Sequence, residues 1–196
     1  MDKEILRQIV HLSGLLFVFI AQFLDKWASA AMFLIIGAFF FTYGEYVKRK
    51  TNAIFGLRKL PFFFERKKSR PFAGAFWFYI GCGISFILFP HIIASAASSV
   101  LAIGDSLSTL IGREIGNHKL IGNKSLEGTL AFFVFSFFLT LFFVKPFIGM
   151  VGALIGALVE LSVPDKLAKK TSLFLDDNFL IPIISGSVMF GLGFVL

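Results

Sequence analysis

A polar segment between two apolar runs contains the residues best suited to chemistry. The stretch 112–128 combines several glycines with three cations and a hydroxyl, namely Arg113, Lys119, Lys124 and Ser125. Glycines let backbone N–H groups converge on an anion, and the cations neutralise its charge. A helix that begins near Ser125 also directs the positive end of its dipole at a phosphate. The segment therefore predicts a nucleotide triphosphate site, with a plain basic hairpin as the alternative.

The segment does not contain a P-loop, because Asn123 separates Gly122 from Lys124, whereas G-x-x-x-x-G-K-[ST] requires the lysine directly after the glycine. The site must therefore draw on residues outside the segment.

Carboxylates near this segment are suited to hold Mg²⁺. Small and polar residues repeat at spacings of four, three, four and three along one helical face: Ser98, Ala102, Asp105, Thr109 and Gly112. Asp105 is expected about 10 Å from the helix end, at a depth where an ionisable residue is functional by default; a structural hydrogen-bond partner is the alternative. Asp105 and Glu127 are predicted to hold the Mg²⁺ that bridges polyphosphate oxygens. Glu160 follows Gly152 and Gly156 at intervals of four, which fits either helix packing or function.

The composition places these residues in an all-α, polytopic integral membrane protein. Hydrophobic residues make up 57% of the 196-residue chain and charged ones 16%, with 28 Phe and a single cysteine, Cys82. A soluble fold of this size has no core large enough to bury so much apolar surface. Seven runs approach the length needed to span a bilayer: 9–24, 27–46, 72–89, 92–112, 126–144, 147–163 and 179–196. Since the first and sixth are short, six helices with an interfacial segment is the alternative to about seven.

The charges orient this single transmembrane domain, 1–196. With the N-terminus cytosolic and the C-terminus outside, all of the 19 Lys and Arg residues except Lys26 and Lys145 fall on the cytosolic side. The cytosolic segments are then a basic loop at 46–71, the nucleotide loop at 113–126 and a loop at 164–178. The basic loop fits either a topology determinant or a site for anionic lipid. No nucleic-acid partner is indicated.

Three parts of the chain resemble the CTP-using polyprenol kinase family, which includes dolichol kinases, phytol kinases and CTP-dependent diacylglycerol kinases. The central match comprises 104–106, 112–119 and 124–128. A second match is Asp-Asp-Asn-x-x-x-Pro at 176–182, similar to the C-terminal element of the family. The third is Arg-Gln-x-x-His at 7–11, where Gln8 replaces the usual Lys.

This resemblance implies transfer of the γ-phosphoryl group of CTP, with Mg²⁺, to the hydroxyl of a membrane lipid alcohol (a polyprenol, a phytol-like isoprenoid or a diacylglycerol) at the cytosolic face. Phosphoryl transfer depends mainly on positioning and charge neutralisation. We expect Asp105 and Glu127 to bind the metal. The nucleotide contacts are expected at Arg113, His118, Lys119, Lys124 and Ser125. Asp177 and Asn178 are candidates for the general base or a second metal site, and His11 and Glu160 for the base or a substrate contact.

Two other functions stay open. Phosphatidate cytidylyltransferases carry a similar central motif and make a CDP-lipid from CTP. Their C-terminal H-G-G-x-x-D-R signature is absent here, because the only histidines are His11, His91 and His118. A membrane transporter or non-catalytic scaffold is the third possibility, although acids crowded at one interface do not suggest a path through the membrane. The membrane is expected to be the cell membrane of a prokaryote or a membrane of the endoplasmic reticulum type.

Overall fold

The computed structural model describes residues 8, 11–49, 72–163 and 176–195. This part of the chain contains helices and no strand; its only strand-like pairing is one antiparallel bridge between Lys119 and Ser125. The helices are α2 (Gly14–Ala21), α3 (Lys26–Arg49), α5 (Ala73–Leu88), α6 (His91–Glu114), α7 (Leu126–Thr140), α8 (Pro146–Ser162) and α10 (Asp177–Val195). The prediction of an all-α fold is therefore confirmed. Most of the basic loop at 46–71 and of the loop at 164–178 lies outside the described residues.

Three helices are long and apolar enough to cross a membrane: Lys26–Tyr46, His91–Glu114 and Asp177–Phe194. Three further apolar helices, α5, α7 and α8, are shorter. Large hydrophobic side chains on the outer surface remain exposed, among them Phe23, Phe142 and Phe194. Lipid tails solvate such a surface, whereas water does not. These features are compatible with an integral membrane protein.

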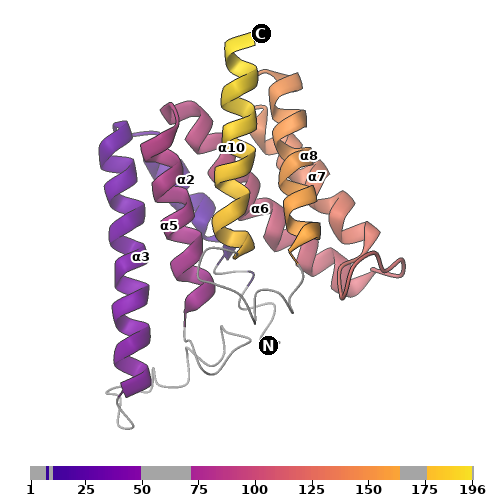
Figure 1. Cartoon of the computed structure of the whole chain (residues 1–196), viewed down its shortest axis with the longest axis horizontal. Coiled ribbons are helices and arrows are strands. Elements are labelled where there is room, and N and C mark those ends of the chain that lie inside the picture. Colours follow the sequence, from indigo (N-terminus) through magenta and orange to yellow (C-terminus); the bar gives the residue numbers. More distant parts are fainter. Residues whose placement is uncertain (1–7, 9–10, 50–71, 164–175, 196) are drawn as a thin grey trace.

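The helices form a bundle in which α6 is central (Figure 1). Helix α6 packs against α2, α5, α7, α8 and α10, while α3 packs mainly on α5. The hairpin between α6 and α7 (115–125), the end of α8 and the start of α10 lie at one end of the bundle, which is the lower end in Figure 1. The turns at 22–25, 89–90 and 141–145 lie at the other end.

Helix α6 can occupy the centre because many of its side chains are small. Its residues from Ile93 to Ala102 are all buried. Close approach of its neighbours also depends on glycine: a Cβ on Gly104 would lie 2.6 Å from the Phe132 ring of α7, and one on Gly156 of α8 would lie 2.6 Å from Val100. Small residues at helix contacts are the usual means by which helices associate in lipid.

Two helix starts are fixed by side chains that accept backbone hydrogen bonds. Asp25 Oδ1 accepts from the N–H groups of Trp27 (2.8 Å) and Ala28 (3.1 Å) at the start of α3. The bonds from Ala28 and Trp27 hold the pKa of Asp25 below its usual value. At the start of α7, the N–H of Gly128 donates to Ser125 Oγ at 3.2 Å. Both caps satisfy N–H groups that have no partner within the helix.

The observed helices coincide with the predicted runs, apart from their ends. Helix α2 is the shortest, with 8 residues, and begins after a turn at Ser13. Helix α7 ends at Thr140 rather than at 144, because a tight turn at 141–144 precedes Pro146 at the start of α8. Both differences are shifts of helix ends, where hydropathy carries little information.

Candidate functional site

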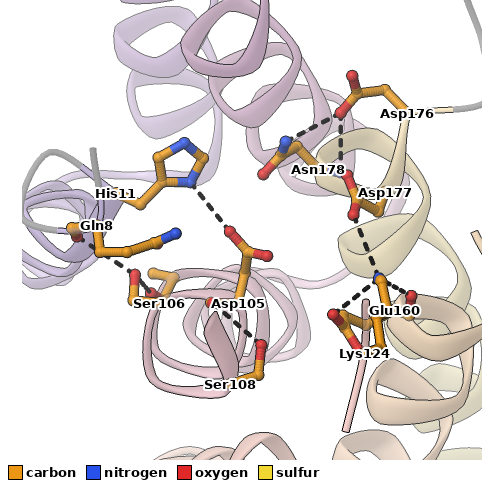
Figure 2. Close-up of polar contacts among 11 residues, drawn as sticks. Gln8, His11, Asp105, Ser106, Ser108, Lys124, Glu160, Asp176, Asp177 and Asn178 are labelled. Atoms are coloured by element: carbon orange, nitrogen blue, oxygen red, sulfur yellow. Dashed lines mark hydrogen bonds and ion pairs between the residues drawn. The ribbon is translucent and has the colours of Figure 1, made fainter. Parts of the chain in front are cut away.

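Asp105 lies at the centre of a cluster of polar side chains near the hairpin end of the bundle (Figure 2). Its side chain is one-tenth exposed, and its Oδ2 lies 3.5 Å from Nδ1 of His11, which is buried. Ser106, the residue after Asp105, connects α6 to Gln8, because its Oγ donates a hydrogen bond to the carbonyl of Gln8 at 3.5 Å. The Asp105 carbonyl accepts from Ser108 Oγ at 3.1 Å. Helix α6 and the N-terminal segment thus hold the His11–Asp105 pair in place.

Lys124 joins the hairpin to α8 and α10 through acidic partners. Its Nζ lies 2.8 Å from Glu160 Oε1 and 3.8 Å from Asp177 Oδ2, and it also donates to the Glu160 carbonyl. The Lys124 and Glu160 side chains are 15% and 8% exposed, so this ion pair is largely buried. Asp105 and Asp177 lie close enough to Glu160 to interact with its charge. Breaking one side of such a buried pair leaves the other charge uncompensated.

The start of α10 adds two further polar residues. Asp176 Oδ1 accepts hydrogen bonds from the backbone N–H (3.1 Å) and the side-chain Nδ2 (3.0 Å) of Asn178. The other amide atom, Asn178 Oδ1, is buried and has no hydrogen-bond partner among the described residues. Burial, followed by the nearby charge of Asp177, raises the pKa of Asp176.

Several acidic side chains of the described residues lie close together in the cluster. Glu160 and Asp176 each interact electrostatically with Asp105 and Asp177, and Lys124 pairs with Glu160 and Asp177. Buried charges are costly unless they are paired. A cation, or a ligand that carries one, would therefore be stabilised here.

The hairpin holds the remaining predicted site residues in two groups. Lys124 and Ser125 point inward: Lys124 binds the acidic residues, and Ser125 caps α7. Arg113, His118 and Lys119 are exposed. The predicted nucleotide contacts thus divide into inward-pointing and exposed residues, and the backbone turns at Gly122, which has φ +61°.

Glu127 contacts the hairpin rather than the acidic cluster. Its Oε1 accepts from the backbone N–H groups of Asn117 and His118, both at 3.2 Å, and lies 2.7 Å from His118 Nδ1. No contact between described residues joins Glu127 to Asp105, its predicted partner in metal binding. Instead, Asp105 is brought together with His11, Asp177, Asn178 and Glu160, which were predicted separately (Figure 2).

The donors of the cluster are suited to Mg²⁺, although no protein cage is preformed. Among the described residues, no three or more His, Cys, Asp or Glu side chains are arranged to hold a metal ion. Mg²⁺ is usually bound by only one or two carboxylates, with substrate phosphates and water completing its shell. The carboxylates of Asp105, Glu160 and Asp177 are ligands of this kind.

Two contacts could not be read from the sequence. Asp176 belongs to the C-terminal motif, but no role was predicted for it, and nothing in the spacing indicates that it orients Asn178. The pairing of Lys124 with Glu160 joins residues 36 positions apart. The sequence singles out Glu160 only by the glycines that precede it at intervals of four, and this spacing does not indicate Lys124 as its partner.

The fold and the cluster define an all-α protein with helices able to cross a membrane and a buried acidic site at one end of the bundle. The chain is 34% identical over 191 residues to the uncharacterized protein MJ1137 of Methanocaldococcus jannaschii, covering 93% of this chain and 90% of that protein. It is 30% identical over 146 residues to the uncharacterized protein RP860 of Rickettsia prowazekii, covering 71% and 70%. The chain belongs to the family of these two proteins. No protein-family profile and no solved structure matches it.

Proposed function

We propose that the protein is a lipid kinase that transfers the γ-phosphoryl group of CTP to the hydroxyl of a membrane lipid alcohol. The observation that carries the proposal is the acidic cluster around Asp105, buried directly beside a lysine-bearing hairpin. Such a site pairs cations for phosphate oxygens with carboxylates for the metal that accompanies them. The resemblance to polyprenol kinases at the hairpin and at 176–182 supports CTP as the donor.

The proposed topology places this site at the cytosolic face. Gln8 contacts Ser106 near the site, and Ala21 contacts His91 at the other end of the bundle. The proposed topology has seven crossings with the N-terminus cytosolic. The distribution of Lys and Arg supports the same orientation.

The roles follow from the position of each residue. Lys124 would exchange its acidic partners for phosphate oxygens, and the exposed Arg113, His118 and Lys119 would approach the nucleotide from the outer side. Ser125 caps the start of α7 and so holds the N-terminal end of this helix toward the phosphates. Asp105, with either Asp177 or Glu160, would hold Mg²⁺, which when bound neutralises charge on the transferred group. Glu127 remains a predicted ligand that would first have to leave His118.

The test is an assay of the purified protein with labelled CTP, Mg²⁺ and a panel of polyprenol, phytol and diacylglycerol acceptors. Label from γ-labelled CTP should appear on a lipid. Label from α-labelled CTP on lipid would instead identify a cytidylyltransferase, and no labelled lipid with either would favour a transporter or scaffold.

Two variants locate the activity. Asp105→Ala should abolish transfer, with a loss of at least about 10³-fold, while thermal unfolding in detergent stays cooperative. Glu114→Gln is the matched control, because Glu114 is an exposed acid on the same helix, and its turnover should stay within about twofold. Near-normal turnover of Asp105→Ala would exclude this site.

A further inference from the structure

The side-chain amide of Asn178 has an orientation fixed by its neighbour. Nδ2 donates to Asp176 Oδ1 at 3.0 Å, and a flipped amide would instead place two oxygens against each other. Oδ1 therefore faces away from Asp176, toward the space next to Asp105 and His11 (Figure 2). Asn178 is 8% exposed, so this acceptor is nine-tenths buried, and no described residue donates to it. A buried acceptor of this kind points to a hydrogen-bond donor supplied by a ligand.

Three elements supply the polar walls of this space. His11 comes from the N-terminal segment, Asp105 from α6 and Asn178 from α10 (Figure 2). The 3.5 Å between His11 Nδ1 and Asp105 Oδ2 is long for a charge-assisted hydrogen bond. Catalytic contacts often have this loose geometry before the substrate is bound. The walls thus combine two acceptors with an imidazole that can take up a proton.

On the side of α5, this group of polar residues meets an aromatic ring. The ring of His11 lies edge-on to that of Phe78, with 5.5 Å between centroids. Helix α5 approaches α10 closely next to Asn178: a Cβ on Gly81 would lie 2.8 Å from the Asn178 carbonyl. A ligand with a polar group on an apolar body would match both the polar side chains and the Phe78 ring. A lipid alcohol has both.

We propose that His11, Asp105 and Asn178 bind the hydroxyl group of the lipid alcohol that accepts the phosphoryl group. This inference rests on the proposed function and extends it to the second substrate. Asn178 Oδ1 accepts the hydroxyl hydrogen and so orients the oxygen. That oxygen forms a bond to the γ-phosphorus as the bond from the γ-phosphorus to the bridging oxygen breaks, and CDP departs with the electron pair. The hydroxyl proton is released to water.

Histidine NMR tests this site without requiring turnover. The chain has three histidines, so ¹³C-labelled histidine gives few signals to assign. His91 lies at the opposite end of the bundle and His118 on the exposed hairpin, and both serve as internal controls. Geranylgeraniol or dioctanoylglycerol in detergent should shift the His11 signal and leave the other two unchanged. The methyl ether of geranylgeraniol, which cannot donate a hydrogen bond, should not shift it.

Asn178→Ala should weaken this response at least about tenfold, and an unchanged His91 signal would show that its fold is intact. The proposal is overturned if neither alcohol shifts the His11 signal, if the ether acts as well as the alcohol, or if Mg²⁺ alone produces the Asn178-dependent shift.

In the lipid kinase assay, Asn178→Ala should raise KM for the alcohol at least about tenfold and leave KM for CTP within about twofold. A shift of the His11 signal by the alcohol without lipid phosphorylation would refute the proposed kinase activity and leave the alcohol site standing. Lipid phosphorylation without this shift would refute the alcohol site and leave the kinase activity standing.

Discussion

The two ends of the bundle each contain a histidine that contacts other segments, but its partners differ. At the end away from the hairpin, His91 Nε2 lies 3.0 Å from the Ala21 carbonyl and 3.3 Å from Ser29 Oγ. Nearby, Gln22 Nε2 donates to Ser95 Oγ at 2.9 Å. These hydrogen-bond partners are neutral and together join the turn after α2 to the start of α6, and the carboxylate of Asp25 lies close enough to His91 to interact with it electrostatically. This end therefore has the features of a structural network.

At the hairpin end, His11 faces the carboxylate of Asp105 and lies near further acids. Here the charges are unequal, and Asn178 retains an acceptor without a donor among the described residues. Structural networks in proteins satisfy their polar groups, whereas functional sites keep charges and acceptors for a ligand. The partners of the two histidines therefore distinguish the two ends.

The largest difference should come from replacing each histidine by glutamine. If His11 helps to position the lipid hydroxyl, His11→Gln should lower kcat about 10²-fold, because a misplaced hydroxyl is no longer in line with the γ-phosphorus. His91→Gln should keep kcat within about twofold, because its contacts are far from the site. The measurement is kcat for both variants in the lipid kinase assay. Equal losses of kcat in the two variants would contradict the distinction between the two ends.

Lys124→Met should destabilise the protein by about 3 kcal/mol, because it leaves Glu160 buried beside other acids. The second change Glu160→Gln should recover most of this loss, since it removes the uncompensated charge. Thermal unfolding in detergent of the single and double variants measures the coupling. Additive losses would show that the buried ion pair contributes no specific stabilisation.

Asp176 should make the stability of the hairpin end depend on pH. Burial and the charge of Asp177 raise its pKa in the folded protein, whereas the unfolded value is about 3.9. Its contribution to stability is therefore complete below the unfolded value and is lost as pH rises through the folded value. Asp176→Asn should flatten this decline in a series of unfolding curves at increasing pH. An equal decline in the variant would assign the effect to another group.

The smallest effect is expected at the neutral end. Gln22→Leu removes the hydrogen bonds to Ser95 Oγ and to the Val18 carbonyl, each 2.9 Å, and should cost about 1 kcal/mol of stability. Lipid kinase activity should not change. A loss of activity in this variant would show that the two ends are coupled and that the comparison is too simple.

Much of the fold was predictable because lipid imposes a simple constraint on sequence. Long apolar runs must form helices whose backbone groups are satisfied internally, and the observed helices coincide with the predicted runs. Their exact ends were less predictable, as the early end of α7 at Thr140 shows. That end depends on a local turn before Pro146 rather than on hydropathy.

The candidate site was predictable in its residues but only partly in their grouping. Residue type and spacing singled out Asp105, Lys124 and Glu160, because a charge within or beside an apolar helix is costly and stands out. Sequence alone thus determined the helical class and the polar side chains available for chemistry. The tertiary structure decided which of them meet: Asp105 lies with His11 and Asn178, while Glu127 binds its own hairpin. These contacts depend on helix packing between distant segments, which residue spacing does not encode.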